Sequence, residues 1–76
     1  MITVKLYGLL RLDSGIKERR VEAGHVKDVL EHLAMQGISR QDLQGCIVMV
    51  NGKSAGKRSK LNDGDVVQLL PPVAGG

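Results

Sequence analysis

Apolar and polar residues alternate at the start of the chain, and this period of two predicts a β-strand over residues 2–10 that Gly8 interrupts. The Asp-Ser-Gly sequence at residues 13–15 favours a turn, because Asp and Ser bond nearby backbone groups and Gly accepts a positive φ. The polar residues 17–22 then predict a second strand. The N-terminal region should therefore fold as a hairpin with a short loop.

The period then changes to that of an amphipathic helix. Four apolar residues recur at helical spacing on one face: Val26, Val29, Leu30 and Leu33. This spacing predicts a helix over about residues 26–36, with Gly24 or His25 at its N-cap and Gly37 as a left-handed C-cap. A weak capping box at residues 39–42 predicts one more short helical turn.

Strand patterns return in the second half of the chain. Residues 46–50 form the most apolar run, which predicts a central strand buried on both faces or nearly so. The Asn-Gly turn at 51–52 leads into residues 53–60, where we expect a short strand and a surface loop. A second tight turn at 62–65 precedes the final strand, residues 66–70.

This order of elements predicts an α+β protein with the β-grasp (ubiquitin-like) arrangement, in which a mixed sheet of four to five strands packs on one main helix. The helix carries the chain across the sheet, so the two end strands can lie side by side and parallel. We expect residues 1–76 to form a single domain, with residues 72–76 as a flexible, extended C-terminal tail.

Composition narrows the class of protein. The chain has 76 residues, 42% of them hydrophobic, so a modest core can form without metals or disulfides. Its single cysteine, Cys46, cannot form an internal disulfide, which indicates a reducing compartment. The N-terminus lacks the pattern of a signal peptide, and no apolar run approaches the roughly 20 residues of a membrane span. We expect a soluble, cytoplasmic protein with no membrane partner.

The candidate chemistry lies at the C-terminus. Pro71 and Pro72 end the last strand, because proline cannot donate to a sheet, and they favour an extended continuation. The four residues 73–76 that follow reach about 14 Å when extended. Glycine has no Cβ, so Gly75 and Gly76 can pass through a narrow channel of another protein. The Gly76 carboxylate could there be activated as an acyl-adenylate and converted to a thiocarboxylate.

Several segments resemble the MoaD/ThiS family of ubiquitin-like sulfur carriers. They are residues 4–11, the turns at 50–52 and 61–66, and above all the Leu-Pro-Pro-Val-Ala-Gly-Gly sequence at residues 70–76. The Pro-Pro-Val-Ala-Gly-Gly ending is closest to the molybdopterin branch, whose carrier is the small subunit of molybdopterin synthase (MoaD-like).

This resemblance implies a site without catalytic side chains. Gly76 would be adenylated by a ubiquitin-activating-type adenylyltransferase (MoeB/ThiF-like) that uses ATP and Mg, and then thiocarboxylated. The tail residues Pro72, Val73, Ala74 and Gly75 would enter the large subunit of molybdopterin synthase (MoaE-like), which places the sulfur on a pterin precursor. The carrier would itself be neither an enzyme nor a cofactor-binding protein.

Other fates of the same carboxylate fit the sequence. The sulfur could serve thiamine, tungsten cofactor or cysteine synthesis, or a ubiquitin-like modifier could be conjugated through Gly76 to lysines of target proteins. Nucleic-acid binding is disfavoured, because the basic loop at residues 57–60 lacks aromatic stacking partners. No metal site is predicted, since His25 and His32 lack a third ligand at suitable spacing. Cys46 is interpreted as a small core residue.

The last strand offers a candidate partner surface. If Val67 and Leu69 point to the core, Val66 and Leu70 fall on the outer face and flank the tail together with Pro71. The alternative is a last strand that is buried on both faces.

Overall fold

The computed structural model describes residues 1–72, so Val73, Ala74, Gly75 and Gly76 lie outside the described residues. The elements in chain order are β1 (Ile2–Leu6), α1 (Gly8–Ser14), β2 (Glu18–Val21), α2 (Val26–Met35), α3 (Arg40–Gly45), β3 (Ile47–Val50), β4 (Lys53–Ser54) and β5 (Val66–Leu70).

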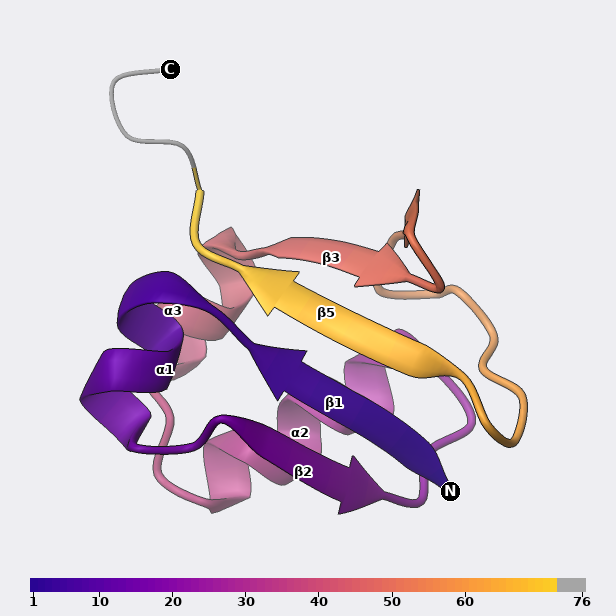
Figure 1. Cartoon of the computed structure of the whole chain (residues 1–76), viewed down its shortest axis with the longest axis horizontal. Coiled ribbons are helices and arrows are strands. Elements are labelled where there is room, and N and C mark those ends of the chain that lie inside the picture. Colours follow the sequence, from indigo (N-terminus) through magenta and orange to yellow (C-terminus); the bar gives the residue numbers. More distant parts are fainter. Residues whose placement is uncertain (73–76) are drawn as a thin grey trace.

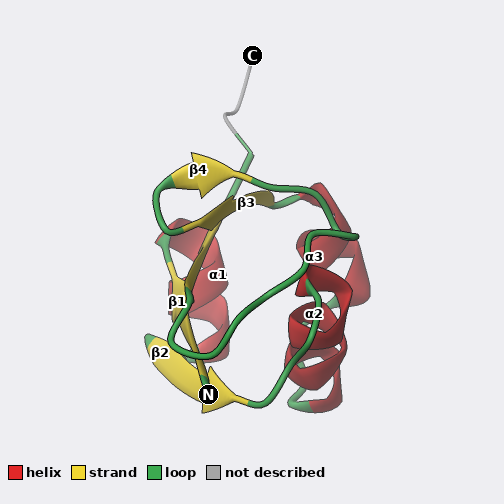
Figure 2. Cartoon of the chain, turned by 90° about the vertical axis from the view of Figure 1, so that its right-hand side faces the viewer, coloured by secondary structure: helices red, strands yellow, loops and turns green. Residues whose placement is uncertain are grey.

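One sheet in the order β2-β1-β5-β3-β4 organises the chain (Figure 1). Strands β1 and β5 are parallel neighbours at its centre, and the other pairs are antiparallel. Figure 2 shows α2 and α3 as a second layer beside the sheet. The mixed five-stranded sheet on one main helix confirms the predicted α+β, β-grasp fold.

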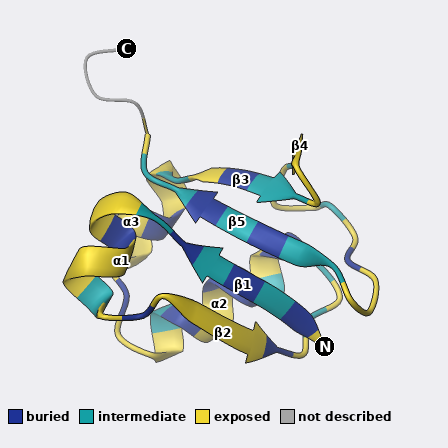
Figure 3. Ribbon diagram, in the orientation of Figure 1, coloured by how far each residue is buried: buried dark blue, intermediate teal, exposed yellow. Residues whose placement is uncertain are grey.

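The core lies between the sheet and α2, and strand burial alternates (Figure 3). Three strand residues have no exposed surface: Val4 on β1, and Val67 and Leu69 on β5. On the facing helix, Val29 and Leu33 are equally buried, as the helical spacing predicts. The apolar sets of strand and helix therefore meet in one layer.

The predicted helices form close to their expected bounds. The His25 backbone N–H at the N-cap of α2 donates to the Asp28 carboxylate at 3.1 Å. Gly37 follows the helix with φ of 100°, which satisfies the predicted left-handed end. Ser39 caps α3 by accepting a hydrogen bond from the Asp42 N–H at 3.5 Å.

The prediction that the N-terminal region forms a hairpin with a short loop is wrong about the connection between the two strands. Strands β1 and β2 do pair antiparallel, but β1 ends at Leu6 and α1 fills the space between them. Gly8 begins α1 with φ of 59°, and Gly15 ends it with φ of 73°. Leu10 of α1 is buried against the core. Leu10 continues the strand-like alternation of the sequence, and the prediction of a strand to residue 10 is therefore wrong for residues 8–10, the first part of α1.

The strand predicted at residues 46–50 forms as β3, but its predicted burial on both faces or nearly so is wrong. Cys46 ends α3, and β3 begins at Ile47. Val48 faces the core with 7% of its surface exposed, whereas Ile47 is 40% exposed. Within the described residues helices cover a single face of the sheet, so the other side of β3 stays open.

Acid is expected to weaken the turn before β5. The Asp65 carboxylate accepts hydrogen bonds from the Asn62 backbone N–H at 2.8 Å and from Asn51 Nδ2 at 2.9 Å. Both bonds lower the pKa of the Asp65 carboxyl, and the bond from the Asn62 backbone has the larger effect. A pKa lowered by folding gives stability that is complete above the unfolded value and is lost as pH falls through the folded value. The urea unfolding midpoint of Asp65→Asn should therefore fall less than that of wild type when the pH is lowered from about 5 to about 2. Equal losses would contradict this.

Candidate functional site

The root of the C-terminal tail is fixed against the start of α1. The Tyr7 N–H donates to the Leu69 carbonyl at 3.1 Å, which ties the end of β1 to the end of β5. Beyond β5, Pro71 is half-buried and Pro72 is exposed. The Pro71 ring lies so close to Gly8 that a Cβ there would be 2.7 Å from Pro71 Cγ. Gly8 thus permits the contact that sets where the chain leaves the sheet.

Strand β5 presents its outer side beside that root. Val67 and Leu69 point to the core, and Val66 and Leu70 are half-buried on the opposite face, as the conditional prediction states. The alternative of a strand buried on both faces is wrong. Val66, Leu70 and Pro71 do lie on or next to the face that no helix of residues 1–72 covers.

Strand β3 extends this surface in a way that the sequence did not indicate. Ile47 lies directly opposite Leu70, and Met49 lies opposite Gln68. We call the apolar set Ile47, Met49, Val66, Leu70 and Pro71 the outer-face patch. Ile47 and Met49 were missed because their side follows from strand register, which the sequence alone does not give.

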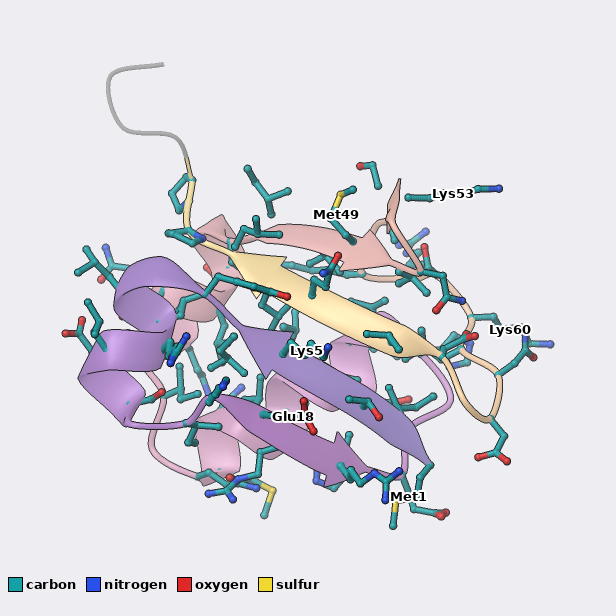
Figure 4. All side chains as sticks on the ribbon, viewed as in Figure 1. Met1, Lys5, Glu18, Met49, Lys53 and Lys60 are labelled. Atoms are coloured by element: carbon teal, nitrogen blue, oxygen red, sulfur yellow. The ribbon has the colours of Figure 1, made fainter. Side chains whose placement is uncertain are left out.

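The neighbouring half of the outer face is polar. Lys5 on β1 and Glu18 on β2 are cross-strand partners (Figure 4). Between the two halves, Gln68 Nε2 donates to Tyr7 Oη at 3.0 Å. The apolar half therefore lies over β5 and β3, next to the tail root, and the charged half lies over β1 and β2.

Cys46 and the histidines have structural surroundings. The half-buried Cys46 thiol donates to the Leu43 carbonyl at 2.9 Å and packs against the core. Burial raises the pKa of this thiol, which favours the protonated, unreactive form. His32 Nε2 lies 3.1 Å from the Glu22 carbonyl. Within residues 1–72 no three His, Cys, Asp or Glu side chains gather as a metal site would require.

The basic loop at residues 57–60 also has a structural role. The carbonyls of Lys57 and Ser59 accept hydrogen bonds from the N–H groups of Lys27 and Val26 at 2.9 and 3.0 Å. These N–H groups belong to the first turn of α2, where backbone donors lack helical partners. The loop thus completes the start of α2.

None of the helices in residues 1–72 combines the length and the apolar character that crossing a bilayer requires. Gly76, whose carboxylate is the predicted reactive group, lies outside the described residues, as do Val73, Ala74 and Gly75. The roles of these four residues therefore stay predictions.

The sheet, the main helix and the tail root together define a ubiquitin-like protein of the β-grasp class. Residues 4–76 match the ThiS family, and the chain belongs to this family of small ubiquitin-like sulfur carriers. No curated protein sequence matches the chain.

Solved structures share the fold over nearly the whole chain. The complex of subunits 1 and 2 of molybdopterin-converting factor from Helicobacter pylori matches with 26% identity and a TM-score of 0.75, covering 99% of this chain and 97% of that one. Small archaeal modifier protein 1 from Methanosarcina acetivorans matches with 26% identity and a TM-score of 0.85, covering 99% and 95%. The BexX/CysO complex of Amycolatopsis orientalis has the same fold at 22% identity and a TM-score of 0.79, covering 100% of each chain.

Proposed function

We propose that this chain carries sulfur for molybdopterin synthesis as the small subunit of molybdopterin synthase, with the Gly76 carboxylate as its site. The observation that carries the proposal is the fixed tail root beside an open apolar surface, in a member of a sulfur-carrier family. The Pro-Pro-Val-Ala-Gly-Gly ending and the likeness to a molybdopterin-converting factor complex support the pathway.

The proposed chemistry uses two displacements at the chain end. A Gly76 carboxylate oxygen attacks the α-phosphorus of ATP and releases pyrophosphate, which leaves an acyl-adenylate. Sulfide-level sulfur (HS⁻) then attacks the carbonyl carbon, AMP leaves as the C–O bond to it breaks, and loss of the sulfur-bound proton to solvent gives the thiocarboxylate. The adenylyltransferase would hold ATP and Mg, so the carrier needs only an accessible carboxylate and a docking surface.

Reconstitution of the last step tests the pathway. Thiocarboxylated chain is mixed with the large subunit of molybdopterin synthase and its pterin precursor, and in parallel with the enzymes of thiamine and cysteine synthesis. We expect molybdopterin to form only in the first mixture, with return of the chain to its carboxylate form. Product in another mixture alone would overturn the molybdopterin assignment and retain sulfur carriage.

A second candidate function is a ubiquitin-like modifier, favoured by the likeness to small archaeal modifier protein 1. The same adenylate would then react with lysine amines of target proteins. Isopeptide adducts of Gly76 in extracts of the native host would support this function, and their absence alongside a thiocarboxylate would exclude it as the main one.

The outer-face patch should contribute to partner binding without holding the fold together. Ile47→Ser removes a 40% exposed apolar side chain from the patch. We expect about a tenfold weaker affinity for the large subunit, because loss of an apolar interface contact typically costs about 1–2 kcal/mol. Calorimetric titration measures the affinity. Met35→Ser, an 82% exposed position on α2, is the matched control and should bind like wild type. Equal affinities for both variants would contradict the assignment.

A further inference from the structure

Helix α1 exposes apolar side chains that the fold does not use. Leu9 is 63% exposed and Leu12 is 74% exposed, whereas Leu10 between them is buried in the core. Residues three apart share a side of a helix, so Leu9 and Leu12 form one apolar stripe. No other described element covers this stripe, and Figure 3 shows most of α1 in the colour of exposed residues.

The stripe borders a groove that begins at the tail root. A hollow of about 390 Å³ lies between α1, α3 and the end of β5, and its lining residues are Leu9, Leu10, Asp13, Gln41, Asp42, Gly45, Pro71 and Pro72. A second hollow of about 190 Å³ shares Leu10, Asp13 and Asp42 with the first and continues to Gly37 and Ser39. We call this pair of hollows the α1–α3 groove.

The charge of the groove is opposite to that of the chain. Its charged lining residues are Asp13 and Asp42, and no Lys or Arg lines it, although the chain carries a net charge of +3. Neither carboxylate forms an ion pair within residues 1–72. Asp13 also lies in the last turn of α1, where a negative charge opposes the helix dipole. Asp42 lies in the first turn of α3, where the dipole favours a carboxylate, so Asp13 is the groove charge for which local stability gives no reason.

We propose that the α1–α3 groove docks a basic, apolar segment of the protein that adenylates Gly76. Aliphatic side chains of that segment pack on Leu9 and Leu12, and an Arg or Lys pairs with Asp13 and Asp42. The groove starts at Pro71 and Pro72, so a segment seated there is adjacent to the point from which Gly76 is delivered. This inference rests on the proposed adenylation of Gly76.

Steady-state adenylation tests the groove, with pyrophosphate release as the readout and the full chain as the varied substrate. The double variant Asp13→Lys/Asp42→Lys should raise KM about tenfold or more with little change in kcat, because opposed like charges at a contact cost more than 1.4 kcal/mol. Glu18→Lys/Glu22→Lys makes the same charge change at exposed carboxylates that form no ion pair in residues 1–72 and do not line the groove, and should keep KM within about twofold. Added salt should raise KM for wild type more than for the groove variant.

A second variant separates docking from folding. Leu9→Ser/Leu12→Ser changes exposed positions only, so it should keep the urea midpoint and still raise KM. Unchanged KM in both groove variants would overturn the groove and leave adenylation intact. A wild-type dimer that Asp13→Lys/Asp42→Lys converts to monomer would show that a second copy occupies the groove, and would also overturn the inference. No adenylation of wild type would overturn the proposed function together with this inference.

Discussion

Removal of Gly76 is expected to reduce sulfur transfer to below about one hundredth of the wild-type rate, since misplacement of a reacting group by even about 1 Å can cost that factor. Deletion moves the terminal carboxylate back by about 3.5 Å along an extended chain. The remaining carboxylate of Gly75 would then fall short of the adenylating site. Transfer is measured as molybdopterin formed per carrier in the reconstituted system.

Deletion of Gly76 should leave the stability of the folded domain unchanged. Leu69 is the last residue of the described core, and Pro71 lies against Gly8 of α1. The urea midpoint of the truncated chain should therefore equal that of wild type. Addition of one leucine after Gly76 should also abolish transfer, because it buries the carboxyl group of Gly76 in a peptide bond. Full transfer by either variant would contradict a role for the terminal carboxylate.

Leu33→Ala is expected to cause a larger loss of stability than any other substitution proposed for this chain. Leu33 lies on the buried face of α2 and has no exposed surface. Truncation of such a residue to Ala leaves a cavity and costs about 3 kcal/mol. A domain of this size is stable by roughly 5–10 kcal/mol, so a large part of its free energy of unfolding would be lost. Urea denaturation followed by circular dichroism measures the difference.

Leu12→Ala provides the matched control. The same chemical change at a side chain that is 74% exposed should alter the free energy of unfolding by no more than about 0.5 kcal/mol. A cost at Leu33 as small as that at Leu12 would show that α2 does not pack on the sheet as described.

The parts of the fold with strong local signals could be predicted from the sequence. The spacing of Val26, Val29, Leu30 and Leu33 located α2 to within about one residue at its end, and the alternation in residues 66–70 matched β5. Helix α1 could not be predicted, because it has seven residues and a single buried one, Leu10. One buried position defines no period, so tertiary packing and the positive φ of Gly8 decided this segment.

The candidate site likewise has one part that the sequence predicts and one part that it does not. A chain-end carboxylate needs no tertiary structure to be recognised, so Gly76 could be proposed from the sequence alone. The outer-face patch depends on register: Ile47 becomes part of it only because β3 pairs with β5 so that Ile47 faces Leu70. The openness of that face follows from helices packing on one side of the sheet, which no local pattern in residues 46–50 reports.

Intact mass spectrometry of the protein isolated from its native host tests the carrier role most directly. If the terminal glycine is where sulfur is loaded and released, a fraction of molecules must be heavier by the exchange of one oxygen for sulfur, and fragmentation must place that exchange on the last residue. A population without this exchange, when the cells are actively making sulfur-containing cofactors, would contradict the account.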